Sequence, residues 1–93
     1  MSRFFVKLLK NDVPHYLVWS TVVDAPVSDG MPLEKFREYF LNSRGQDFVE
    51  YFDEHIEIAN KNYEENLNFI DLNRAGGNEE QLTIDEIIEY YCT

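Results

Sequence analysis

Cysteine, proline and glycine are scarce in this chain of 93 residues, with one, three and four copies. The single cysteine, Cys92, has no partner for an internal disulfide, which is typical of a protein from a reducing compartment. The few prolines and glycines form no repeat, low-complexity tract or linker. Because domains commonly run from about 50 to 200 residues, we expect residues 1–93 to form a single domain.

Long apolar runs are also missing. No stretch approaches the roughly 20 apolar residues that a membrane-spanning helix needs. The apolar start, MSRFFVKLLKND, is short, is interrupted by Lys7 and Lys10, and is followed by no small-residue cleavage site. We therefore expect a strand there instead of a signal peptide, and a cytoplasmic protein that does not enter membranes.

Basic residues are few: eight lysines and arginines stand against eighteen acids, for a net charge of −10. Residues 1–33 hold three of each sign, so the whole acidic excess lies in residues 34–93. Such a surface repels nucleic acid and anionic membranes and attracts basic partners. We expect no direct nucleic-acid binding.

Two strands are predicted near the start. Apolar residues alternate with Arg3 and Lys7 over residues 3–9, the period of a half-buried strand. Asn11, Asp12 and Pro14 mark a turn. Residues 15–23, rich in β-branched and aromatic side chains, should form the second strand of a hairpin. Residues 24–32 contain two prolines and a glycine and read as a turn-rich connector.

Helices are predicted for most of the remainder. The first covers residues 33–42 and ends at Ser43 or Gly45, and a second begins with Ser43 and Gln46 in capping-box spacing and runs to about residue 62. Residues 64–73 fit a helix or a strand, and we favour the helix.

A loop covers residues 74–81, and Gly76-Gly77 ends the element before it. Thr83 and Glu86 stand in capping-box spacing before a short final helix. The fold class is therefore α+β: an N-terminal antiparallel β-hairpin, with room for a third strand, and three or four short helices packed on one face of it.

One helical stretch, QDFVEYFDEHIE at residues 46–57, is crowded with acids and aromatics. At about 100° per residue, its acids occupy an arc of roughly 120°, opposite an apolar arc. We call these acids the acidic face: Asp47, Glu50, Asp53, Glu54 and Glu57. The opposite arc consists of Phe48, Val49, Phe52, Ile56, Ala59 and Tyr63.

The acidic face has two interpretations. It is either a solvated surface or a partner-binding site. Only Lys61, four residues after Glu57, offers a helical ion-pair partner, whereas an ordinary surface would mix both signs. Acids three or four positions apart rise about 5 Å along the axis, the order of magnitude of phosphate spacing in a nucleic-acid strand. Such a row fits a basic groove built for phosphates.

Catalytic, metal and cofactor sites are not predicted. General acid–base catalysis needs a carboxyl group with a shifted pKa in a cleft, whereas these acids are expected on an exposed face. His55 has no second histidine at helical ligand spacing, and His15, beside a proline, is expected in a turn or at a sheet edge. Cys92 lacks nucleophile partners and is expected to be poorly ordered. Gly76-Gly77 is followed by acids, so it is no phosphate loop.

Three further aromatics admit two interpretations. Trp19, Tyr90 and Tyr91 are most simply core or core-edge residues. Tryptophan and tyrosine are also enriched at the centres of protein interfaces, so any of them could anchor a partner instead.

The segments WSTVVDAPVSDGMPLEKFREYF (19–40) and LNRAGGNEEQLTIDEIIEYYC (72–92) carry a resemblance. They resemble a family of small proteins of tailed bacteriophages, notably actinobacterial ones, in which a strand leads to Val-Asp-Ala-Pro-Val, Gly-Met and an acidic helix. Pro32 stands where a helix-capping threonine is usual, and residues 43–70 depart from the pattern. The resemblance implies a phage origin and no biochemical activity.

We therefore expect a non-enzymatic acidic phage protein that binds and modulates a host protein in the bacterial cytoplasm. By analogy with small phage proteins made for host takeover, the partner has a basic, nucleic-acid-handling surface, and the acidic face acts as a nucleic-acid mimic and inhibitor. The alternative is a small structural or regulatory phage module whose acidic face is only solvated.

Overall fold

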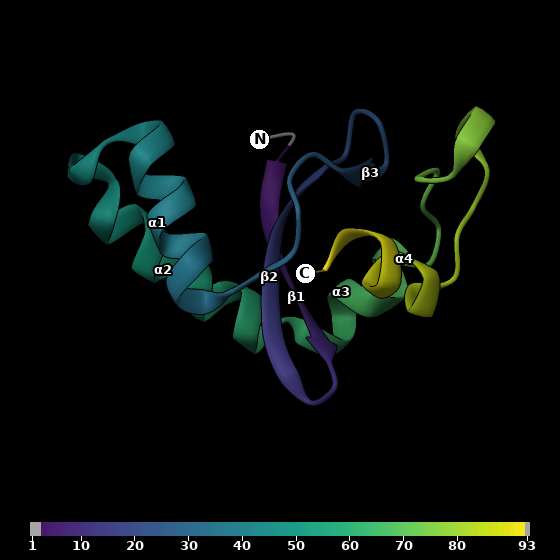
Figure 1. The fold of residues 1–93 in the computed structure, drawn as a ribbon, viewed down its shortest axis with the longest axis horizontal. Helices are drawn as coiled ribbons and strands as arrows, with labels where there is room; N and C mark the ends of the chain where they lie inside the picture. Colours follow the sequence, from purple (N-terminus) through teal and green to yellow (C-terminus); the bar gives the residue numbers. More distant parts are fainter. Residues whose placement is uncertain (1–2, 93) are drawn as a thin grey trace.

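A long antiparallel hairpin runs through the centre of the protein, whose computed structural model describes residues 3–92 (Figure 1). β1 (Arg3–Lys10) pairs with β2 (Val13–Ser20) along their full length. Asn11 and Asp12 both have positive φ, 52° and 63°, as a two-residue type I′ hairpin turn requires. The predicted hairpin is confirmed, but its second strand begins and ends earlier than expected.

A third strand is present in two short pieces. β3 (Ala25–Pro26) and β4 (Met31–Pro32) both pair antiparallel with β2, on the edge opposite β1. Between them the Val27 amide donates to the Val18 carbonyl at 2.8 Å, and the Val18 amide donates to the Ser28 hydroxyl at 2.9 Å. A serine side chain thus completes the sheet edge where the connector leaves it.

Within residues 3–92, four α-helices and two 3-10 turns follow the sheet: α1 (Leu33–Arg44), η1 (Gln46–Phe48), α2 (Val49–Lys61), α3 (Tyr63–Ile70), η2 (Gly77–Glu79) and α4 (Ile84–Tyr91). The helical interpretation of residues 64–73 is confirmed by α3 for residues 64–70, whereas residues 71–73 lie beyond its end. The α4 capping box is also present, with the Thr83 hydroxyl accepting from the Glu86 amide at 3.1 Å and the Glu86 carboxylate accepting from the Thr83 amide at 3.0 Å.

The prediction of a second capping box, between Ser43 and Gln46, is wrong. Ser43 lies in the last turn of α1, which continues two residues further than expected and ends at Gly45. Gly45 has a φ of 103°, a conformation that glycine adopts without strain. The chain then enters η1, and α2 starts at Val49 with no side-chain cap.

Helices cover both faces of the hairpin, so the expectation of a single covered face is wrong (Figure 1). One buried cluster joins the sheet to α1 and α2: Phe5, Tyr16, Phe36, Phe40, Leu41, Phe52, Ile56 and Ala59. The other joins it to α3 and α4: Val6, Leu8, Leu17, Trp19, Ile70, Ile87 and Cys92. Both sides of β1 are apolar, and successive side chains point to opposite faces, so each face needs a cover.

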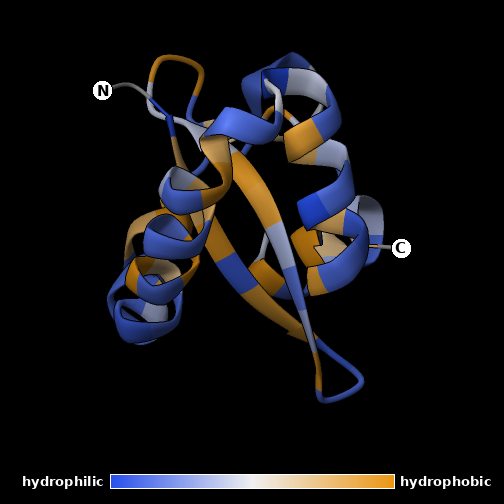
Figure 2. Cartoon of the chain, turned by 90° about the vertical axis from the view of Figure 1, so that its left-hand side faces the viewer, coloured by the Kyte–Doolittle hydropathy of each residue, from blue (hydrophilic) through white to orange (hydrophobic). Residues whose placement is uncertain are grey.

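Hydropathy follows this layering. The two long strands are coloured mostly as hydrophobic, whereas the helices carry both colours (Figure 2). The hairpin is therefore the shared inner layer, and each helix presents a polar side outward. Among residues 3–92, no helix has the length and the apolar surface needed to cross a bilayer.

Candidate functional site

The acidic face lies on the outer side of η1 and α2. All five of its acids are exposed, while Phe52, Ile56 and Ala59 of α2 are buried against the sheet. The predicted separation of exposed acids from buried apolar side chains is confirmed for these residues. Because α2 rises 5.4 Å per turn, its four acids form a row along the surface.

Asp47 does not belong to α2. It lies in η1, and the regular spacing of 100° per residue applies only from Val49 onward. The same offset explains Phe48, which was expected in the core but is 39% exposed. The acidic face is therefore a helical row of four acids with a fifth acid just before its first turn.

Asp53 forms the one ion pair found on the acidic face within residues 3–92. Its Oδ1 lies 3.1 Å from Nη1 of Arg37 in α1, and the Arg37 guanidinium also lies over the Phe52 ring, 5.8 Å from its centre. Both partners are about half exposed, and such pairs contribute roughly 0–1 kcal/mol.

The other acids of the face have no ion-pair partner among the described residues. Lys61, the helical partner that the sequence offers to Glu57, makes no ion pair within residues 3–92. Asp47, Glu50, Glu54 and Glu57 are likewise unpaired there. Four of the five negative charges are thus compensated only by solvent, which leaves them available to a basic surface.

The two histidines have structural partners. His55 Nδ1 lies 2.8 Å from the Tyr51 carbonyl oxygen, and its ring stacks on Tyr51 with centres 3.8 Å apart. His15 was expected in a turn or at an edge, but it is buried in β2, because β4 covers the sheet edge beside it. No group of three or more potential metal ligands occurs in the described part of the chain.

Cys92 is buried, so the expectation that this residue is poorly ordered is wrong. It forms a parallel bridge with Gly30, and its carbonyl oxygen accepts from the Lys10 ammonium at 2.8 Å. Burial raises the pKa of the Cys92 thiol, and the nearby Lys10 charge only partly opposes this. A thiol with a raised pKa is a poor nucleophile at neutral pH.

The remaining aromatics divide. Trp19 is only 1% exposed, as expected for a core residue. Tyr91 is half-buried and donates its hydroxyl to the Ala75 carbonyl at 3.2 Å. Tyr90 is 70% exposed, so its placement in the core or at its edge is wrong, because it lies on the outward side of α4.

Sequence reasoning missed two features. Asn73 is buried in the loop after α3 and makes four hydrogen bonds with its amide group. Arg3 and Arg44 line one pocket although they are far apart in the chain. No local pattern in the sequence signals the second feature, because Arg3 belongs to β1 and Arg44 to α1.

No protein-family model, curated protein or solved structure matches this chain.

Proposed function

We propose that this is a non-enzymatic phage protein that binds a basic surface of a host protein through the acidic face. The observation that carries the proposal is the row of exposed acids on η1 and α2, of which only Asp53 has an ion-pair partner within residues 3–92. The resemblance of residues 19–40 and 72–92 supports a phage origin, and we therefore propose a partner in the cytoplasm of a bacterial host cell.

The charge arrangement favours a partner that handles nucleic acid. Acids three or four positions apart in the row rise about 5 Å along the helix axis, and phosphates in one strand of duplex DNA repeat on a similar scale. A groove built from lysine and arginine to hold phosphates therefore meets a comparable series of negative charges here. Binding at that groove would exclude nucleic acid and inhibit the host protein.

The rigidity of the row supports this role. α2 is fixed to the sheet by its buried residues and by Tyr16, whose hydroxyl donates to Asn60 Oδ1 at 2.8 Å. Acids held on a packed helix lose less conformational entropy on binding than acids on a mobile segment.

Competition with DNA tests the proposal. The protein would be immobilised and incubated with a bacterial lysate at low ionic strength, and each retained protein purified. We expect to retain a nucleic-acid-binding protein, and we expect this protein to release duplex DNA from it in a mobility-shift assay. A retained partner that binds DNA and this protein at the same time would contradict the mimicry.

A further inference from the structure

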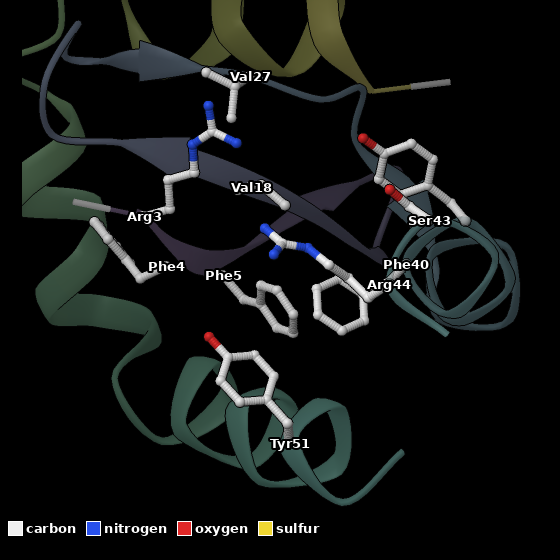
Figure 3. Close-up of a pocket in the computed structure, with 10 residues that line it drawn as sticks. Arg3, Phe4, Phe5, Val18, Val27, Phe40, Ser43, Arg44 and Tyr51 are labelled. Atoms are coloured by element: carbon white, nitrogen blue, oxygen red, sulfur yellow. The ribbon is translucent and has the colours of Figure 1, made fainter. Parts of the chain in front are cut away.

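A small pocket opens between the sheet and the helical layer of α1 and α2 (Figure 3). Its volume is about 100 Å³. The residues that matter for its chemistry are Arg3, Phe5, Phe40, Ser43, Arg44 and Tyr51. We call it the arginine pocket. It lies apart from the acids of the acidic face, none of which lines it.

Local geometry places both arginines at the rim of the aromatic wall that lines the pocket. Arg3 and Phe5 lie on the same face of β1, because side chains two positions apart in a strand share a face. Arg44 follows Phe40 by four residues in α1, so the two lie on the same side of that helix. Figure 3 shows the Arg3 guanidinium beside Val27 and the Arg44 guanidinium beside Val18, above the Phe5 and Phe40 rings.

Three aromatic rings form a continuous wall of the pocket. The rings of Phe40 and Tyr51 are parallel within 4°, with centres 5.9 Å apart. Phe5 meets the Phe40 ring edge-on at 5.2 Å. Phe5 and Phe40 are buried, so this wall is held by the core and does not depend on a ligand.

The charges of the pocket are unusual for this chain. Arg37 and Arg74 each form an ion pair with an aspartate, at 3.1 and 3.2 Å. Arg3 and Arg44, in contrast, make no side-chain hydrogen bond or ion pair within residues 3–92. In a protein with a net charge of −10, two unpaired guanidinium groups line the same small space.

We propose that the arginine pocket binds a small aryl oxyanion, a phosphate or carboxylate group carried on an aromatic ring. Planar guanidinium groups bind such oxyanions through paired hydrogen bonds. The Ser43 and Tyr51 hydroxyls supply further donors, and the exposed part of the aromatic wall contacts the ring of the ligand. A cavity of about 150 Å³ holds benzene, so this smaller, open pocket takes a headgroup and part of one ring.

Titration with phenyl phosphate, followed by amide NMR shifts, tests the site. We expect saturable binding with a Kd of about 1 mM or lower, and shifts centred on β1 and the end of α1. Benzoate should compete for the same residues. Inorganic phosphate lacks the aromatic ring and should bind more weakly. Phenol lacks the phosphate group and should not bind.

Charge-neutralising variants give the control. Arg3→Gln and Arg44→Gln should each raise the Kd for phenyl phosphate about tenfold or more, without changing the thermal transition, because both side chains are exposed. Lys61→Gln changes the net charge equally outside the pocket and should leave the Kd unchanged. Non-saturable shifts, or equal weakening by all three variants, would overturn the proposal.

Discussion

Gly30 lies directly against Cys92, so the connector between the sheet strands meets the end of the chain. The Gly30 amide donates to the Tyr91 carbonyl at 2.5 Å, and a Cβ atom placed on Gly30 would stand 2.5 Å from the Cys92 sulfur. Only a residue without a side chain allows this approach. The contact fixes the end of α4 to the sheet edge.

Gly30→Ala should therefore lower the free energy of unfolding by about 2 kcal/mol, the usual loss for overpacking a core. Denaturant titration measures this loss. In the double variant Gly30→Ala, Cys92→Ala, the new methyl group at residue 30 no longer meets the sulfur. The unfolding free energy lost by the double variant should therefore be smaller than the sum of the losses of the two single variants. Full additivity would show that the close approach to the sulfur is not the cause.

Asn73 holds the loop that leads from α3 to α4. Its Nδ2 donates to the carbonyls of Ile70 at 2.8 Å and Leu82 at 2.7 Å, while its Oδ1 accepts from the amides of Ala75 and Leu82. Asn73→Asp keeps the shape but removes both donors, so we expect a loss of about 3 kcal/mol in unfolding free energy. Asn68→Asp, on the exposed side of α3, makes the same charge change and should have little effect.

The α4 capping box gives a smaller, local prediction. Thr83→Ala removes the oxygen that accepts from the Glu86 amide and should lower stability by about 1 kcal/mol. Thr83→Ser retains a hydroxyl and should keep most of the stability that the cap contributes. An unchanged denaturation midpoint for Thr83→Ala would show that the cap contributes nothing.

Tyr16 predicts a dependence of stability on alkaline pH. Burial raises the pKa of Tyr16. The folded state therefore holds the phenol proton more strongly than the unfolded state, where the pKa is about 10. The stabilisation of the folded state by the protonated Tyr16 is complete below about pH 10, and it is lost as the pH rises through the pKa of Tyr16 in the folded state.

Thermal melts across this range compare the wild type with Tyr16→Phe. The variant should be less stable by about 1 kcal/mol near neutral pH, where the bond to Asn60 is missing, and should lose less stability as the pH rises. Tyr90→Phe, at an exposed tyrosine, should follow the wild type. Parallel curves for all three proteins would exclude Tyr16 as the titrating group.

Local patterns predicted the local structure. The hairpin followed from strand periodicity and turn residues, and α4 followed from Thr83 and Glu86, because the interacting groups are close in sequence. The exposure of Glu50, Asp53, Glu54 and Glu57 followed in the same way from the helical period. These features need only backbone geometry and a local pattern.

Features that depend on distant contacts could not be predicted. Helices cover both faces of the sheet because Phe5 and Val6, which point to opposite faces of β1, are both buried. A half-buried strand pattern does not predict this. Arg37, the partner of Asp53, comes from another helix, and the arginine pocket is lined by Arg3 and Arg44, which lie far apart in the chain. Tertiary packing alone brings such residues together.

Charge reversal on the acidic face tests the central claim most directly. The variant Glu50→Lys, Glu54→Lys, Glu57→Lys changes three exposed acids and keeps the ion pair of Asp53 with Arg37. The control Glu79→Lys, Glu80→Lys, Glu89→Lys makes the same charge change at exposed positions in and near η2 and in α4. Circular dichroism should show an unchanged helix content in both.

The measurement is the Kd for the DNA-binding partner isolated from host lysate, by titration calorimetry at low and at physiological ionic strength. The wild type should bind more weakly at the higher ionic strength, where the Debye length is about 8 Å. Reversal of the acidic face should raise the Kd about 100-fold, because like charges then meet, whereas the control should change it far less. Equal Kd values for the two triple variants would contradict the claim that this face is the binding site.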